Sequence, residues 1–350
     1  MIFFTFIVEA QECYRISGKI SGMTAGALLL IGNEEEKPDT LGTTTVKDGV
    51  FIFTGKVNRP MAAYITSSDG NRMIPLILEN TSIMVNIGNT GVLVQGGKQQ
   101  ELLTRFTRIS QVFLAEQAKV VAKAQQPGEN IQILQDQLNK AYETSMNATL
   151  ELIKANPDDY ATAHVIALGI REETEEGLRS KYNLLGETAR ATVPGKRIAA
   201  TLEQYEKLAE GEIAPDFTLV KPDGDAFSLH DVPAKWKLLH FWAAHVDNSR
   251  RDNIDLVKLY LQYRPRGLEI ISVALDDNRS MWKQAIGLDG MIWTNGSDHK
   301  GMNSEIVHLY LVNDLPAYFL LDAENRIVAR DLLLPDLRLK LAELTKKKRK

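Results

Sequence analysis

The chain has 350 residues, of which 44% are hydrophobic and 25% are charged, and its formal net charge is -4. This composition is typical of soluble globular protein, and the length allows two or three domains that each bury a core. The slightly acidic balance excludes a broad basic surface for nucleic acid. No apolar run reaches the roughly 18 residues that a membrane-spanning helix needs. We therefore predict no nucleic-acid partner and no transmembrane segment.

The N-terminus resembles an export signal with a clipped start. An apolar run over residues 2–8 is followed by Val8-Glu9-Ala10, and small residues at these spacings are accepted by signal peptidase. The positively charged leader that normally precedes such a run is missing, and a buried first strand is the alternative. We predict a truncated signal peptide over residues 1–10, a mature chain beginning at Gln11, and a periplasmic or otherwise extracytoplasmic location.

The chain contains a single cysteine, Cys13. An intramolecular cycle of disulfide formation and reduction needs two thiols, so the chain cannot perform one. Cys13 follows a short apolar run, as a lipidated cysteine does, but Glu12 stands where a lipidation motif needs a small residue. A lipid anchor at Cys13 is therefore not expected.

Residues 11–97 alternate with a period of two, which is typical of half-buried antiparallel strands. In the first of them, Tyr14, Ile16, Gly18 and Ile20 share one face. The turn signal Lys47-Asp48-Gly49 precedes another such strand. Short strands at regular spacing predict a small all-β sandwich, and this section carries no histidine.

From residue 98 the apolar period changes to three and four, which predicts helices. Gln126-Pro127-Gly128 separates two of them, and further helices fill the section to residue 210. His164 lies in a helix among apolar residues and is predicted to be a core residue. We therefore predict a helical connector over residues 98–210.

Residues 211–350 alternate strands with helices and end in a hairpin and a helix. A strand is predicted over residues 237–241, followed by a helix from about residue 248 to residue 263. This order predicts an α/β domain with a βαβ core and antiparallel edges.

Several strings in this section resemble the extracytoplasmic thioredoxin-like proteins of the TlpA and ResA type, which are related to the AhpC/TSA family. The strings are Ala214-Pro215-Asp216-Phe217, His240-Phe241-Trp242-Ala243 and Leu315-Pro316-Ala317-Tyr318-Phe319-Leu320-Leu321-Asp322. The N-terminal section, with Lys47-Asp48-Gly49-Val50-Phe51 and Ile77-Leu78-Glu79, is similar to the DUF4369-like β-domain that precedes such domains in Bacteroidetes. The resemblance implies a thioredoxin-like fold over residues 211–350.

In that family, the strand ending in Phe-Trp-Ala runs into a Cys-x-x-Cys pair at a helix N-terminus, where the helix dipole stabilises a thiolate. The resemblance places the first cysteine at Val246 and the second at Ser249, and it retains Arg250. Neither a valine nor a serine can replace a thiol in exchange chemistry. Ser249, with Asp247 and Asn248, is predicted instead to cap the helix.

Pro316 matches the cis-proline that faces the cysteine pair in this family. Its presence fits either maintenance of the fold or retained docking of an extended peptide. A hydroxyl nucleophile built from His245, Ser249 and Asp252 is a weaker alternative, because no oxyanion-hole donors can be identified. The residues predicted to form a binding surface are Trp242, His245, Val246, Ser249, Arg250, Leu315 and Pro316.

Two functions remain open at this stage. The leading hypothesis is a redox-inactive thioredoxin-like protein that binds a protein or peptide partner, with no catalytic residue and a role in redox homeostasis only by resemblance. The rival is a thiol-disulfide oxidoreductase or peroxiredoxin-like enzyme that works without a Cys-x-x-Cys pair, through Cys13 or another nucleophile. No cofactor is predicted, and the histidines show no metal-site spacing; His240 is expected to be buried with its hydrogen bonds satisfied.

Overall fold

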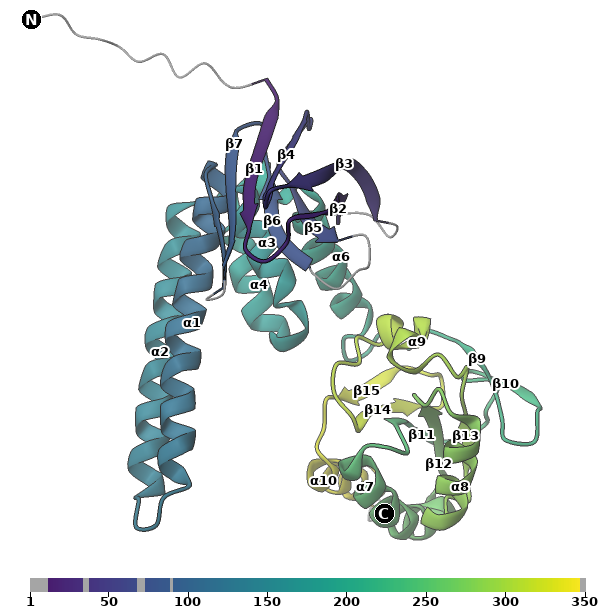
Figure 1. Cartoon of the computed structure of the whole chain (residues 1–350). Coiled ribbons are helices and arrows are strands. Elements are labelled where there is room, and N and C mark those ends of the chain that lie inside the picture. The colour runs from purple at the N-terminus through teal and green to yellow at the C-terminus, as the bar shows by residue number, and fades with distance from the viewer. Residues whose placement is uncertain (1–11, 34–37, 68–72, 89–90, 347–350) are drawn as a thin grey trace, which may run out of the picture. The chain divides into compact units, whose positions relative to one another are not determined.

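The computed structural model describes residues 12–33, 38–67, 73–88 and 91–346. The predicted signal peptide over residues 1–10 lies outside these residues. The chain divides into two compact units, Met1–Ala199 and Ala200–Lys350, which are described in turn (Figure 1).

The described part of the first unit contains one sheet of eight strands in the order β6-β5-β2-β3-β4-β1-β7-β8. The strands are β1 (Tyr14–Ile20), β2 (Ala25–Gly32), β3 (Asp39–Lys47), β4 (Val50–Gly55), β5 (Met61–Ser67), β6 (Met73–Leu78), β7 (Ser82–Gly88) and β8 (Gly91–Gln95). This confirms the predicted all-β section, although β3, β5 and β8 were not identified from the sequence.

The sheet buries one face, as the alternation predicted. In β1, Tyr14, Ile16 and Ile20 are buried, and they share one apolar core with residues from both halves of the sheet. The halves join at the β3–β4 hairpin, where Asp48 and Gly49 have φ of 52° and 77° and form the predicted turn. The sandwich thus takes the form of a single sheet that folds over its own core.

Helices follow the sheet in the same unit. They are α1 (Lys98–Ala124), α2 (Ile131–Ala155), α3 (Tyr160–Leu168), η1 (Ile170–Glu172), α4 (Glu175–Asn183) and α5 (Glu187–Arg190), with α6 (Val193–Lys207) running across the boundary between the units. The first two form a long antiparallel hairpin that extends away from the sheet (Figure 1). Within the described ranges, none of the helices combines the length and hydrophobicity needed to cross a bilayer.

Side chains from these helices complete the hydrogen bonding of the sheet. Gln100 of α1 accepts a hydrogen bond from the backbone N–H of Ile77 in the edge strand β6, at 2.8 Å. Tyr160 of α3 accepts one from the N–H of Ala62 in β5, also at 2.8 Å. The start of α1 and the start of α3 are therefore integral to the β-domain.

The second unit is an α/β domain. Its elements are β9 (Thr218–Val220), β10 (Ala226–Ser228), β11 (Trp236–Trp242), α7 (Asp247–Tyr263), η2 (Arg264–Arg266), β12 (Leu268–Ala274), α8 (Arg279–Asp289), β13 (Thr294–Gly296), η3 (Gly301–Asn303), α9 (Glu305–Leu309), β14 (Ala317–Asp322), β15 (Ile327–Arg330) and α10 (Leu334–Leu344). The short elements β13 and α9 were not identified from the sequence.

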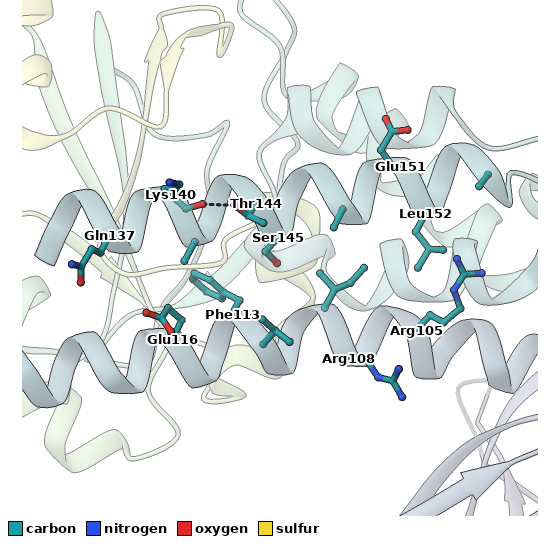
Figure 2. Close-up of a pocket in the computed structure, with 15 residues that line it drawn as sticks. Arg105, Arg108, Phe113, Glu116, Gln137, Lys140, Thr144, Ser145, Glu151 and Leu152 are labelled. Atoms are coloured by element: carbon teal, nitrogen blue, oxygen red, sulfur yellow. Dashed lines mark hydrogen bonds between the residues drawn. The ribbon is translucent and has the colours of Figure 1, made fainter. Parts of the chain in front are cut away.

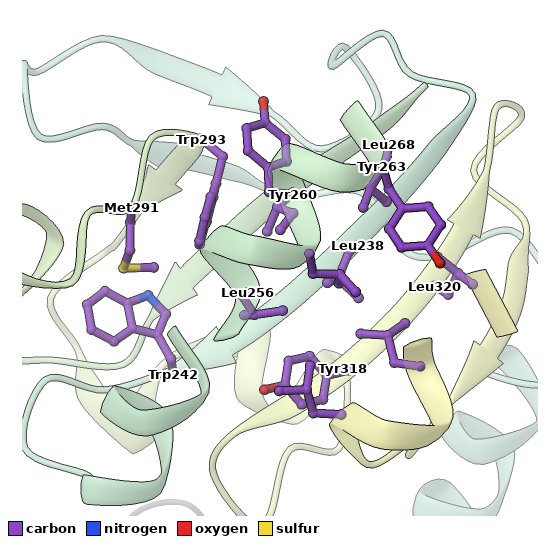
Figure 3. Packing of buried hydrophobic residues seen from close by; sticks show 14 of the residues in the cluster. Leu238, Trp242, Leu256, Tyr260, Tyr263, Leu268, Met291, Trp293, Tyr318 and Leu320 are labelled. Carbon is purple, nitrogen blue, oxygen red and sulfur yellow. The ribbon is translucent and has the colours of Figure 1, made fainter. Parts of the chain in front are cut away.

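The central sheet has the order β13-β12-β11-β14-β15, with β11 parallel to β12 and antiparallel to β14. Alternate residues of β11 face opposite sides. Leu238 joins a core with α7, α8 and α10 (Figure 3), and Leu239 joins a second core with α9 and the segment around β9. This βαβ core followed by a ββα unit confirms the thioredoxin-like fold that the resemblance implied.

Candidate functional site

The candidate site is the loop that joins the buried strand β11 to α7. Val246 occupies the N-cap of α7 with extended backbone, φ -99° and ψ 112°, and none of the described side chains caps this end. The predicted cap by Asp247, Asn248 and Ser249 is therefore wrong, because these residues form the first turn of the helix itself. A half-buried apolar side chain thus stands at the position to which the resemblance assigned the first cysteine.

Ser249 lies beneath this surface. Its side chain is fully buried, and its hydroxyl accepts a hydrogen bond from the backbone N–H of Ala243 at 3.5 Å. The position to which the resemblance assigned the second cysteine thus holds an inward-facing hydroxyl that helps to fix the loop before α7.

Asp276, two residues after the end of the neighbouring strand β12, holds the same loop. Its carboxylate is buried, and both of its oxygens lie 3.0 Å from the backbone nitrogen of Ala244. One oxygen also lies 3.4 Å from Nδ1 of His245, whose side chain is 63% exposed. Asp276 was not identified from the sequence, although its place after a parallel strand is a usable signal, because the carboxyl ends of such strands meet at one edge of the sheet.

Arg250 ties the start of α7 to the end of α8. Its Nε and Nη2 each lie 2.6 Å from an oxygen of Asp289, whose side chain is only 5% exposed. Asn253 donates a further hydrogen bond to the same carboxylate at 2.8 Å. Hydrogen bonding to Asp289 raises the pKa of the Arg250 guanidinium, which keeps this side chain charged. Asp289 was also missed.

The Leu315–Pro316 peptide bond is cis, as the resemblance implied. Pairing of Phe241 with Ala317 in the sheet places Pro316 beside the end of β11, where the loop to α7 begins. Leu315 packs partly against the core on the α9 side.

The seven predicted binding residues separate into exposed and supporting groups. Trp242 and Ser249 are fully buried, so they cannot touch a partner; Trp242 instead packs within the core near Met291 (Figure 3). The side chain of Arg250 is 30% exposed and forms an ion pair with Asp289. We define the α7-tip surface by the members that remain accessible, which are His245, Val246, Leu315 and Pro316.

The structure gives separate partners to the residues of the hydroxyl-nucleophile alternative. His245 contacts Asp276, Ser249 faces Ala243, and Asp252 accepts a hydrogen bond at 2.7 Å from Tyr318. Burial, followed by the bond to Asp252, raises the pKa of the Tyr318 phenol. His245 is therefore not placed as a base for the Ser249 hydroxyl, and Asp252 does not orient His245.

His240 lies below the site in β11 and is fully buried. Its Nδ1 lies 3.0 Å from the hydroxyl of Ser272, and its ring stacks on those of Tyr318 and Trp242, with centroids 5.2 and 6.4 Å away. Among the described residues its Nε2 has no hydrogen-bond partner, so the expectation that His240 is satisfied holds for one nitrogen only. Burial lowers the pKa of His240 to about 3, which keeps the ring neutral.

Two protein families match separate parts of the chain. Residues 14–103 match a domain of unknown function, DUF4369, and residues 211–330 match the AhpC/TSA family. The second match includes the loop from β11 to α7, and it also includes Asp276 and Pro316.

Similar proteins are found for the second unit. The thiol-disulfide oxidoreductase ResA of Bacillus thuringiensis (strain Al Hakam) is 28% identical over 123 residues, which are 35% of this chain and 69% of that protein. ResA of Bacillus subtilis (strain 168) is 24% identical over 123 residues, covering 35% of this chain and 67% of that protein. A solved thiol-disulfide oxidoreductase from Bacteroides fragilis NCTC 9343 is 31% identical, covers 38% of this chain and 99% of its own, and aligns with a TM-score of 0.36. The chain therefore combines an AhpC/TSA family domain over residues 211–330 with a DUF4369 domain over residues 14–103.

Proposed function

We propose that this chain is a redox-inactive, extracytoplasmic thioredoxin-like protein that acts by binding a protein or peptide at the α7-tip surface. One observation carries the proposal: the two positions that the resemblance assigns to the cysteine pair hold a half-buried valine and a buried serine, in a loop fixed by Asp276. A thiolate is the reacting group in disulfide exchange, and no side chain of this loop can supply one.

The α7-tip surface supports the binding half of the proposal. Val246 and Pro316 give it apolar area, His245 gives it a polar group beside that area, and buried hydrogen bonds hold its backbone in place. A surface that is ordered before binding loses little conformational entropy when a partner docks.

The enzyme hypothesis rests on Cys13, which is an exposed, free thiol immediately before β1. We expect the purified protein to give no reduction of insulin by dithiothreitol above the uncatalysed rate, and no peroxidase turnover. The Cys13→Ser variant should give the same rates. Activity in the wild-type chain that disappears in Cys13→Ser would establish the rival function and overturn the proposal.

Val246→Asp tests the binding surface. A carboxylate at this position should abolish binding of the partner, because the charge would have to be desolvated when the apolar contact forms. The unfolding temperature should stay unchanged, because the side chain is only half-buried in the free protein. The measurement is affinity capture from periplasmic extract with the wild type, Val246→Asp and a control variant as baits in parallel, followed by affinity determination on the purified partner. Leu339→Asp, on α10 at a side chain that is 71% exposed, is the matched control. Equal affinity for all three baits would remove the α7-tip surface from the proposal.

A further inference from the structure

The hairpin of α1 and α2 carries an apolar groove that the proposed function does not use. The groove has a volume of about 890 Å³ and runs along the seam between the two helices (Figure 2). Ile109, Val112 and Phe113 line it from α1, and Val112 is 66% exposed. Most of the residues that line it from α2 are short, and they are Ala141, Thr144, Ser145, Ala148 and Ala155. The short side chains of α2 leave the apolar side chains of α1 partly open to solvent.

The shape of the groove fits a helix. On α2 the residues that line it run from Gln137 to Ala155, which is about 27 Å at 1.5 Å per residue. Short side chains on α2 permit a close approach of another helix, since the side chains at the contact set the distance between helix axes. The backbone groups of α1 and α2 are paired within each helix, so the groove offers no edge to an extended strand. An occupant therefore has to satisfy its own backbone groups, which a helix of about 18 residues does over this length.

Three cations line this groove, and none of them forms an ion pair with another residue that the structure describes. They are Arg105, Arg108 and Lys140, and all three side chains are exposed. Figure 2 shows Arg105 directed toward α2, whereas Arg108 lies on the side of α1 that faces away from α2. Positive charge therefore lies both at the seam and on its rim.

The two acidic residues that line the groove are already paired with lysines of their own helices. Glu116 lies 3.1 Å from Lys119, and Glu151 lies 2.9 Å from Lys154. The unpaired charge of the groove is therefore positive, although the chain as a whole has a formal net charge of -4. Uncompensated cations beside an exposed apolar strip favour a partner that brings both apolar side chains and carboxylates.

We propose that the groove binds an acidic amphipathic helix of another protein, which lies along the seam of α1 and α2 and completes a three-helix bundle. Apolar residues of that helix, spaced at three and four, pack on Ile109, Val112 and Phe113. Its carboxylates flank the apolar stripe and pair with the three cations of the groove. This binding site belongs to the first unit and is distinct from the α7-tip surface.

Two synthetic helical peptides of about 18 residues test this proposal on the full-length protein. Both carry leucines spaced at three and four on one face and alanines on the opposite face, and the flanks hold glutamate in one peptide and lysine in the other. Fluorescence anisotropy should show saturable binding of the acidic peptide. The basic peptide should bind about tenfold more weakly or less, because it replaces ion pairs with contacts between like charges. Equal affinities for the two peptides, or no binding of the acidic one, would overturn the proposal.

Variants of α1 locate the bound peptide. Val112→Asp should weaken binding of the acidic peptide by about tenfold or more, because it places a carboxylate in the apolar contact. Leu114→Asp alters a side chain that is 56% exposed but outside the groove, and it should bind the peptide as the wild type does. Wild-type affinity in both variants would show that the peptide binds elsewhere, and the groove would lose its assignment.

Charge reversal separates recognition by the groove from attraction to the whole chain. Arg108→Glu should weaken binding of the acidic peptide by about fivefold and strengthen binding of the basic one. Lys123→Glu makes the same change in net charge at an exposed position of α1 outside the groove, and it should leave both affinities near those of the wild type. Equal effects of the two variants would mean that the peptides respond only to net charge, which contradicts the proposed pairing.

A second copy of the chain and a lipid surface are the competing occupants of the groove. Light scattering of the protein without peptide should give the mass of one chain, 39.1 kDa. Vesicles of phosphatidylcholine and phosphatidylglycerol should not retain the protein when they are floated on a density gradient. A doubled mass, or retention on the vesicles, that Val112→Asp abolishes would assign the groove to that occupant and overturn the proposal.

Discussion

Val246→Cys/Ser249→Cys, in a Cys13→Ser background, is expected to form a reversible disulfide and to reduce insulin. The reason is that the surroundings of a cysteine pair are otherwise present: the N-terminus of α7, the loop held by Asp276, and Pro316 immediately before β14. A thiol at the N-cap lies at the positive end of the helix dipole, which lowers its pKa and favours the attacking thiolate. Titration of free thiols before and after reduction should change by two per chain.

The two single variants and an off-register pair are the controls. Val246→Cys or Ser249→Cys alone cannot close the ring, and Val246→Cys/Asn248→Cys places the second thiol on the exposed side of the first turn. None of the three should reduce insulin. A correctly folded Val246→Cys/Ser249→Cys protein that keeps both thiols free in oxidising buffer would show that the register assigned to this loop is wrong.

Acid should destabilise the second unit through His240. The pKa of this ring is lowered from 6.5 to about 3 in the folded chain, so between these values the unfolded chain binds a proton that the folded chain does not. The contribution of the neutral ring to the free energy of unfolding is fully present above pH 6.5 and is lost as the pH falls toward 3. The slope that one such group adds is about 1.4 kcal/mol per pH unit.

The measurement is the free energy of unfolding of the wild type minus that of His240→Phe, followed from pH 7 to pH 4. Phenylalanine can keep the stacking with Tyr318, and Ser272 still accepts a hydrogen bond from Trp293 at 2.8 Å. His164, whose pKa burial lowers to about 4, is present in both proteins and cancels in the difference. Parallel curves for the two proteins would contradict the buried neutral state of His240.

The sequence predicted elements that have a regular apolar pattern of sufficient length. The alternation in β1 and the helical period of α1 each identify a buried face, and the turn at Asp48-Gly49 requires the positive φ values that were found. β13, which spans Thr294–Gly296, has three residues and no apolar alternation, so its place is set by pairing with β12 and not by its own sequence.

At the site, the sequence predicted the loop but not how it is held. The three polar residues after Val246 have the composition of a helix cap. Whether they cap α7 or belong to its first turn depends on the residue at which the helix begins. Ser249 faces inward because α7 already begins at Asp247. Asp276 and Asp289 act across elements that are separated in sequence. Asp276 has a signal in its place after a parallel strand, whereas the contact of Asp289 with Arg250 leaves no local pattern.

The bond from Gln100 to the N–H of Ile77 also bears on where the β-domain ends. β6 is an edge strand, and an edge strand with open backbone groups can pair with another molecule. The DUF4369 match ends at residue 103, beyond Gln100, whereas the last strand ends at Gln95. A chain cut directly after the strands would retain every β residue, yet it would lose the side chain that covers this N–H. The first turn of α1 therefore covers part of this edge, and we expect a β-domain cut after Gln95 to aggregate more readily than one that extends past Gln100.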